Sequence, residues 1–144
     1  MKIHKSIRMF LKHLILFMFG GFVYVGMELC FRGYSHISMW FLGGLCFILI
    51  GAINELIPWS MKFWKQMLIG AIIITVLEFI TGIVVNLWLG LQVWDYSTMP
   101  LNILGQICLP FTIIWFFMSA IAIVVDDHLR YKWFGEEKPR YDLI

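Results

Sequence analysis

The sequence predicts an all-α integral membrane protein, a bundle of four transmembrane helices with a structured outer loop between the third and fourth. Hydrophobic residues make up 61% of the 144 residues and charged residues only 14%. Soluble domains average about 45–50% apolar and about 25% charged residues. The chain also has four apolar runs, each near the roughly 20 residues that a spanning helix needs. We therefore expect one membrane domain over residues 1–144, without a soluble catalytic domain.

The expected spans are residues 11–30, 39–57, 66–89 and 106–125. The first follows a basic stretch, as a signal peptide does, but no small-residue cleavage site follows it, so we expect a retained helix. Pro58 closes the second span. Pro110 falls in the first turn of the fourth, where the missing N–H is tolerated.

Basic residues give the bundle a direction. Four lie in the N-terminal arm, two in the second loop and four in the tail, whereas the other side has only Arg32. Because cytoplasmic loops are rich in Lys and Arg, we expect a cell-membrane protein with both termini cytoplasmic. Aromatic rings favour the membrane interfaces. The residues expected there are Trp40, Trp88, Trp94 and Tyr96 on the outer side, and Trp59, Trp64, Tyr131 and Trp133 on the inner side.

Small and polar residues recur at helical spacing in every span, as in the series Ala71, Thr75, Glu78, Gly82 and Asn86. Such residues let helices approach closely and form hydrogen bonds across the contact. This pattern predicts bundle seams. The three cysteines have no CxxC spacing, which gives no support to a metal site or a redox motif, and we expect them to be small buried hydrophobes.

Glu78 stands apart because it lies twelve residues from Gln66, about 18 Å along a helix. That is near the middle of a hydrocarbon layer about 30 Å thick. A charge there costs at least about 2.5–3.5 kcal/mol. Protonation, or hydrogen bonds from Tyr, Thr or Asn, would lower this cost. Glu78 is then either a proton or cation relay or a neutral, hydrogen-bonded tie between helices.

The other acidic residues lie nearer the helix ends. Glu28 can pair with Arg32 four residues on, as a local salt bridge or at the mouth of a site. Glu55 is close enough to the end of its helix to reach water. The simplest interpretation of the run 126–128 (Asp, Asp, His) is a solvated helix end.

The loop after the third span interleaves polar and apolar residues, and we expect it to fold as a cap over the outer end of the bundle. Asp95 can accept a hydrogen bond from Ser97 in an Asx turn. The residues that mark this loop motif are Trp94, Asp95, Tyr96, Ser97, Pro100 and Asn102.

This stretch resembles the family named putative ABC-transporter type IV, or CmpB-like. The family has a WDYS motif, then a Pro and an Asn, then a G-x-I-C-L segment that opens a helix containing a Trp. The matching residues here are 94–97, Pro100, Asn102, Gly105, 107–109 and Trp115, with Leu77, Glu78, Thr81 and Gly82 upstream. The chain departs at Gln106, where the family often has Arg, so a basic partner for Asp95 or Glu78 is missing.

The resemblance implies a membrane protein related to transport, but no substrate. We expect a transporter or permease-like subunit with an acidic site at mid-membrane, and the candidate residues are Glu78, Glu28, Asn86, Thr75 and Glu55. The alternative is a membrane interaction or scaffold protein whose buried carboxylate is structural. An intramembrane enzyme is least favoured, because no Ser–His–Asp set or HExxH motif occurs.

The partners follow from the same features. The chain has no GxxxxGK[ST] phosphate loop, so an ATPase would be a separate subunit. Four short helices are few for a conducting path, so we expect a homo-oligomer or a partner subunit in the lipid bilayer. Nothing in the sequence indicates a cofactor, a metal, a catalytic set or a nucleic-acid partner.

Overall fold

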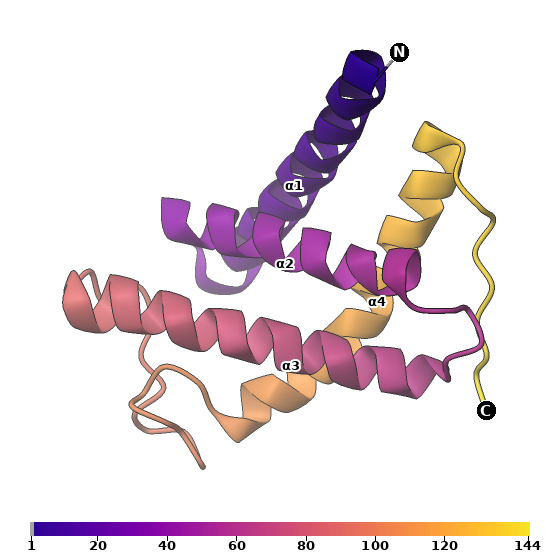
Figure 1. The fold of residues 1–144 in the computed structure, drawn as a ribbon. Coiled ribbons are helices and arrows are strands. Elements are labelled where there is room, and N and C mark those ends of the chain that lie inside the picture. Colours follow the sequence, from indigo (N-terminus) through magenta and orange to yellow (C-terminus); the bar gives the residue numbers. More distant parts are fainter. Residues whose placement is uncertain (1) are drawn as a thin grey trace.

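A computed structural model, which describes residues 2–144, confirms the predicted fold class (Figure 1). The helices are α1 (Lys2–Arg32), α2 (Ile37–Leu56), α3 (Phe63–Gly82), its π-helical continuation η1 (Ile83–Trp88) and α4 (Leu109–Phe134). Four helical segments are long and apolar enough to cross a membrane, with α3 and η1 forming one of them.

Helices α1 and α4 extend several turns beyond one end of their predicted spans. Helix α1 begins at Lys2, so the basic arm is itself helical. Helix α4 continues past residue 125 to Phe134 and ends at Gly135, whose φ of 67° is the left-handed conformation that commonly stops a helix. The polar residues 126–132 continue the helix because oppositely charged side chains three and four positions apart pair along it.

Local signals set the other helix ends. The His36 side chain accepts a hydrogen bond from the Ser38 backbone N–H and caps the start of α2. Ile57 is extended, with φ −112° and ψ 140°, as expected for a residue that precedes a proline. Pro110 lies in the first turn of α4, as predicted.

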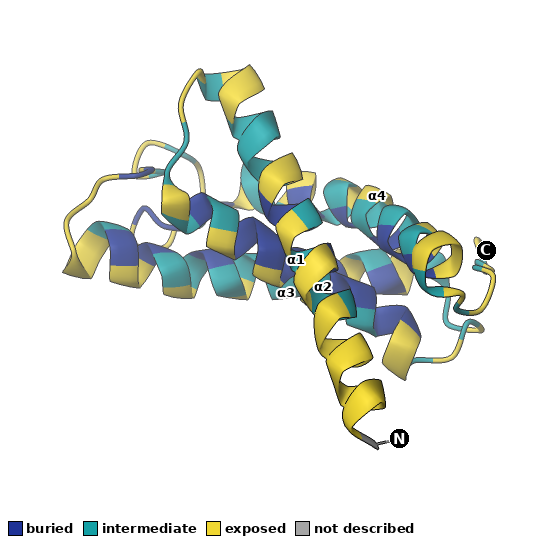
Figure 2. Ribbon diagram, turned by 90° about the horizontal axis from the view of Figure 1, so that it is seen from above, coloured by how far each residue is buried: buried dark blue, intermediate teal, exposed yellow. Residues whose placement is uncertain are grey.

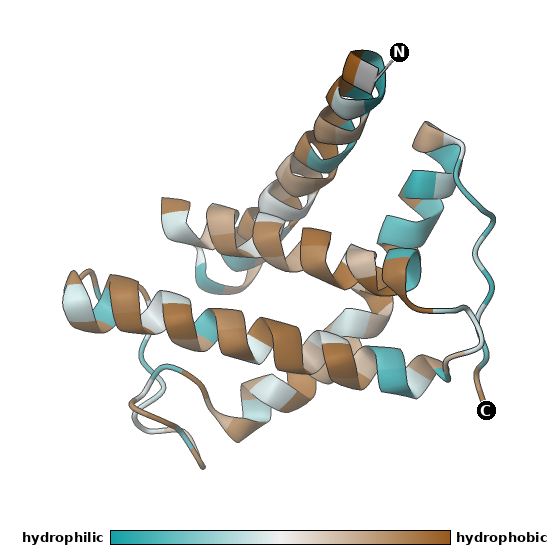
Figure 3. Cartoon of the chain, viewed as in Figure 1, coloured by the Kyte–Doolittle hydropathy of each residue, from teal (hydrophilic) through white to brown (hydrophobic). Residues whose placement is uncertain are grey.

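The helices form two antiparallel pairs joined through α2. Helix α1 packs on α2, α3 packs on α4, and α2 also contacts both α3 and α4 (Figure 1). The N-terminal turns of α1 extend away from the other helices and are largely exposed, whereas buried residues gather where α2, α3 and α4 meet (Figure 2). Hydrophilic residues concentrate in the last turns of α4, beside the end of α2 (Figure 3).

Glycines allow close helix contacts, as the seam pattern predicts. A Cβ atom at Gly44 of α2 would lie 2.7 Å from the backbone oxygen of Phe17 in α1. A Cβ at Gly70 of α3 would lie 2.7 Å from the Ser119 Cβ of α4. Two apolar clusters fill the space between the helices. Their buried members are Met39, Leu42, Cys46, Val85, Val93 and Trp94 in one, and Ile50, Ile53 and Ile123 in the other.

Gly44→Ala is expected to lower the free energy of unfolding by about 1–3 kcal/mol, because backbone cannot move aside for the new methyl group and the two helices must separate. Unfolding in mixed detergent micelles, followed by circular dichroism, measures this change. Gly26→Ala in α1 is the matched control, since nothing lies within 4 Å of its Cβ position. A Gly44→Ala variant as stable as Gly26→Ala would contradict close packing of α1 on α2.

Candidate functional site

Glu78 joins three parts of the chain at one carboxylate. It lies on α3 and only 3% of it is exposed. The Tyr96 hydroxyl of the outer loop donates to Oε1 over 2.8 Å, and the Trp115 indole N–H of α4 donates to Oε2 over 2.9 Å. A tyrosine is among the donors that the sequence predicts, whereas the tryptophan is not. The carboxylate therefore links α3, the loop and α4.

Tyr96 is held in place from its other side. Its ring stacks on Phe111 of α4, with centroids 4.7 Å apart. Burial, and then the nearby Glu78 carboxylate, raise the pKa of the Tyr96 phenol. The hydroxyl therefore keeps the proton that it donates to Glu78.

Glu78 also reaches a small apolar cavity between the helices. The cavity has a volume of about 100 Å³ and its wall includes Tyr24, Cys46, Ile50 and Trp115. An acidic side chain in the wall of an apolar cavity has few polar neighbours, so the two hydrogen bonds from Tyr96 and Trp115 are its main stabilisation.

The outer loop folds as a compact cap. Asp95 Oδ1 accepts from the Ser97 backbone N–H over 2.8 Å, which confirms the predicted Asx turn. The Asn102 amide donates to the carbonyl oxygens of Ser97 and Met99 and accepts from the Gly105 N–H. Gly105 has a φ of 69°, a conformation that favours glycine. The loop motif is thus an internal network of hydrogen bonds.

Trp94 and Tyr96, which the sequence places near the outer membrane interface, turn toward the protein. Only 7% of Trp94 is exposed, and its indole N–H donates to the Gln106 carbonyl oxygen over 3.0 Å. Both rings pack inward because the loop turns back over the bundle and gives their polar atoms protein partners. Sequence composition alone does not separate an inward-facing loop aromatic from an interfacial one.

Asn86 and Thr75 are predicted to share a site with Glu78, but their side chains form hydrogen bonds with other residues. The Asn86 amide donates to Gln106 Oε1 over 2.8 Å and accepts from the Val93 N–H over 2.7 Å, so it fixes the start of the loop. The Thr75 hydroxyl lies 3.4 Å from that of Thr112 and joins α3 to α4. Gln106 is a neutral part of this network, with only 3% of it exposed. These residues act as ties between elements.

Glu28 and Arg32 form the expected pair four residues apart at the end of α1. Arg32 also donates to the Val93 carbonyl oxygen over 3.0 Å. The pair therefore anchors the end of α1 to the outer loop.

The opposite end of the bundle holds a second polar group, which we name the Arg130 cluster. Its members are Lys12, Glu55, Asp126, Asp127, Arg130 and Glu136. The prediction of a solvated helix end at residues 126–128 is wrong for both aspartates, of which only 1% and 2% is exposed, whereas His128 is exposed. The aspartates turn inward because Arg130, one helical turn further on, pairs with both of them, and Gly51 on α2 leaves room for Asp126.

Arg130 is the centre of this cluster, with 4% of it exposed. Its Nε donates to Asp126 over 2.7 Å, Nη2 donates to Asp127 and to the Gly51 carbonyl oxygen, and Nη1 donates to Glu136 over 2.9 Å. Arg130 is one of the four basic residues counted in the tail from the sequence. The spacing of Asp126, Asp127 and Arg130 is the signal that could have placed it in the cluster.

Lys12 and the C-terminal segment complete the Arg130 cluster. Lys12 of α1 contacts Glu55 at 3.1 Å and Glu136 at 2.7 Å. Burial alone would raise the pKa of Glu136, but the hydrogen bond and charge of Lys12, with Arg130, lower it. Burial, followed by the charge of Asp127, raises the pKa of the Tyr141 phenol, which donates to Asp127 over 2.9 Å. The cluster thus ties α1, α2, α4 and the C-terminal segment.

The prediction that all three cysteines are buried is wrong for one of them. Cys46 and Cys108 are buried, but Cys30 is exposed on α1. It lies on a face of α1 that no other helix covers.

These features define the class of the molecule: an all-helical integral membrane protein with a buried carboxylate under the outer loop and an ion-pair cluster at the opposite end of the bundle. The chain belongs to the family described as "Putative ABC-transporter type IV", whose model matches residues 8–140. Neither a curated protein nor a solved structure matches the chain.

Proposed function

We propose that the chain is a transporter or permease-like membrane subunit in which Glu78 is an acidic site for a proton or a small cation. The observation that carries this proposal is a carboxylate with 3% exposure, placed against a cavity and covered by Tyr96 of the outer loop. Ionisable residues within a membrane are costly and commonly mark ion pathways.

The arrangement corresponds to a closed site. The outer loop contacts Glu78 through the Tyr96 hydroxyl, which donates a hydrogen bond to Oε1. A movement of the loop would therefore free this carboxylate oxygen on the outer side. The Glu28–Arg32 pair and Asn86 hold the base of the same loop, and Thr75 holds α4 beside it. In this proposal these four residues position the cap, whereas Glu78 meets the transported ion.

The proposed setting is the cell membrane, with both termini in the cytoplasm, because the Lys and Arg residues gather on that side. A complete path would use a second copy of the chain or another membrane subunit. Any ATPase would be a separate chain on the cytoplasmic side.

The alternative function is a membrane interaction or scaffold protein in which Glu78 is structural. The specific observation in its favour is that both carboxylate oxygens already accept a hydrogen bond from the protein.

Ion flux separates the two functions. Vesicles that contain the purified chain and the pH-sensitive dye pyranine are given a potassium gradient and valinomycin, so that the inside becomes negative. We expect acidification with the wild-type chain and a loss of about tenfold or more in its rate with Glu78→Gln, because the amide cannot exchange a proton at that site.

The matched control is Glu137→Gln, which makes the same chemical change at an exposed residue paired with Arg140. A parallel assay with rubidium ions tests a small cation in place of the proton. Glu78→Gln vesicles that carry either ion as fast as the control would favour the scaffold function.

A further inference from the structure

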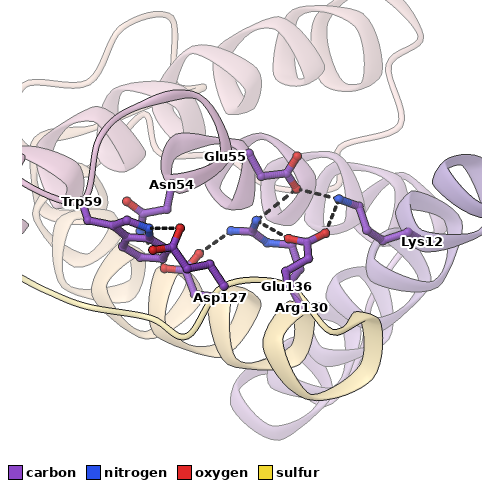
Figure 4. A pocket seen from close by; sticks show the side chains of 8 residues that line it. Lys12, Asn54, Glu55, Trp59, Asp127, Arg130 and Glu136 are labelled. Carbon is purple, nitrogen blue, oxygen red and sulfur yellow. Dashed lines mark hydrogen bonds and ion pairs between the residues drawn. The ribbon is translucent and has the colours of Figure 1, made fainter.

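A polar cavity lies beside the Arg130 cluster, at the end of the bundle opposite the outer loop. It has a volume of about 320 Å³, within the range of about 300–1,000 Å³ that is usual for ligand sites. Four carboxylates line it, those of Glu55, Asp127, Glu136 and Glu137, against the two cations Lys12 and Arg130. Figure 4 shows these side chains converging from α1, α2, α4 and the C-terminal segment.

Asn54 provides an independent sign that the cavity takes a ligand. Only 8% of this residue is exposed, and it lies in the cavity wall (Figure 4). Its Nδ2 donates to Asp127 over 2.6 Å, but its Oδ1 accepts no hydrogen bond from the described part of the chain. Buried side-chain acceptors nearly always have a partner. The wall of the cavity therefore contains a buried acceptor that lacks a donor.

We propose that this cavity binds an ammonium or guanidinium group. Such a group carries N–H donors for Asn54 Oδ1 and a positive charge for the surplus of carboxylates. The Trp59 indole in the same wall provides an aromatic surface of the kind that attracts cations. An anion fits poorly, because Lys12 and Arg130 already contact carboxylates.

Two sources could supply this group: a free organic cation, or a lysine or arginine side chain of another protein. Trp59 of the second loop and Glu136 and Glu137 of the tail lie in its wall, at the end of the bundle that a subunit on that side of the membrane would contact. This site is separate from Glu78 and does not depend on ion flux through it.

The test is isothermal titration calorimetry on the full-length chain in uncharged detergent micelles. The probes are ethylammonium, ethylguanidinium and the peptide acetyl-Gly-Arg-Gly-amide, with tetramethylammonium as a cation that has no N–H donor. We expect saturable binding of at least one N–H probe, about tenfold or more tighter than that of tetramethylammonium, which can use the charge and the Trp59 ring but has no N–H for Asn54 Oδ1. Binding of ethylammonium or ethylguanidinium would show that the cavity accepts a free organic cation. Binding of the peptide alone would show that it takes a side chain of another protein.

Two variants locate the binding. Asn54→Leu removes the free acceptor at nearly constant size and is expected to weaken binding by about tenfold. Because this change also removes the donor to Asp127 and can affect folding, Glu55→Gln is the second variant, which removes one charge of the wall. Asp142→Asn is the control, since it removes one charge from a half-exposed residue paired with Lys62 outside the cavity.

The proposal is overturned if no N–H probe binds to the wild-type chain or if tetramethylammonium binds equally well. It is also overturned if folded Glu55→Gln and Asn54→Leu bind the probes as tightly as Asp142→Asn does. If Asn54→Leu does not fold, Glu55→Gln and its control decide the result.

Discussion

Arg130→Met is expected to lower the free energy of unfolding by about 3–5 kcal/mol, the largest effect of any single change considered for this chain. The guanidinium is 4% exposed and donates to Asp126, Asp127, Glu136 and the Gly51 carbonyl oxygen. Methionine fills much of the same space but leaves two aspartates buried without their counter-ion. Removal of one partner from a buried ion pair costs far more than the net contribution of the pair.

Unfolding in mixed detergent micelles, followed by circular dichroism, measures this loss. Arg140→Met is the matched control, because Arg140 pairs with Glu137 at 2.8 Å but its side chain is 71% exposed. Exposed ion pairs contribute about 0–1 kcal/mol. Equal stability of the two variants would contradict the burial of the Arg130 cluster.

Much of the fold could be predicted from hydropathy, because lipid permits only helices or closed barrels and four apolar runs of the right length remain. Contacts between residues that are close together in the sequence could be predicted as well. Pro110 in a first turn, the Asp95 and Ser97 turn, and the Glu28–Arg32 pair depend on neighbours in the sequence, and the structure has all three.

The contacts of the Arg130 cluster could not be predicted from local sequence. A run of charged residues at a helix end is usually solvated, and its burial here depends on Gly51 and Asn54 of α2, which are far away in the chain. For the same reason, the hydrogen bond from Trp115 to Glu78 could not be predicted from the sequence. A tryptophan in an apolar helix has no sequence signal for its partner until the helix pairs are known.

Trp115→Phe is the second change expected to have a large effect. It removes the N–H that donates to Glu78 Oε2 over 2.9 Å and leaves that oxygen unpaired in a residue that is 3% exposed. An unsatisfied buried acceptor costs about 1–3 kcal/mol, and the smaller ring adds a loss of packing. The same unfolding assay measures this effect. Trp88→Phe, at an indole that is 79% exposed, is the matched control and is expected to change stability by about 0.5 kcal/mol or less.

A double-mutant cycle with Glu78→Gln isolates the hydrogen bond from the packing loss. The combined variant should be more stable than the sum of the single changes predicts, with a coupling energy of about 1.5–3 kcal/mol for a charge-assisted bond. Such a coupling means that Glu78 can be released only if α3 and α4 separate as well as the outer loop. A coupling near zero would contradict the contact and leave Tyr96 as the sole constraint, so that movement of the loop alone would open the site.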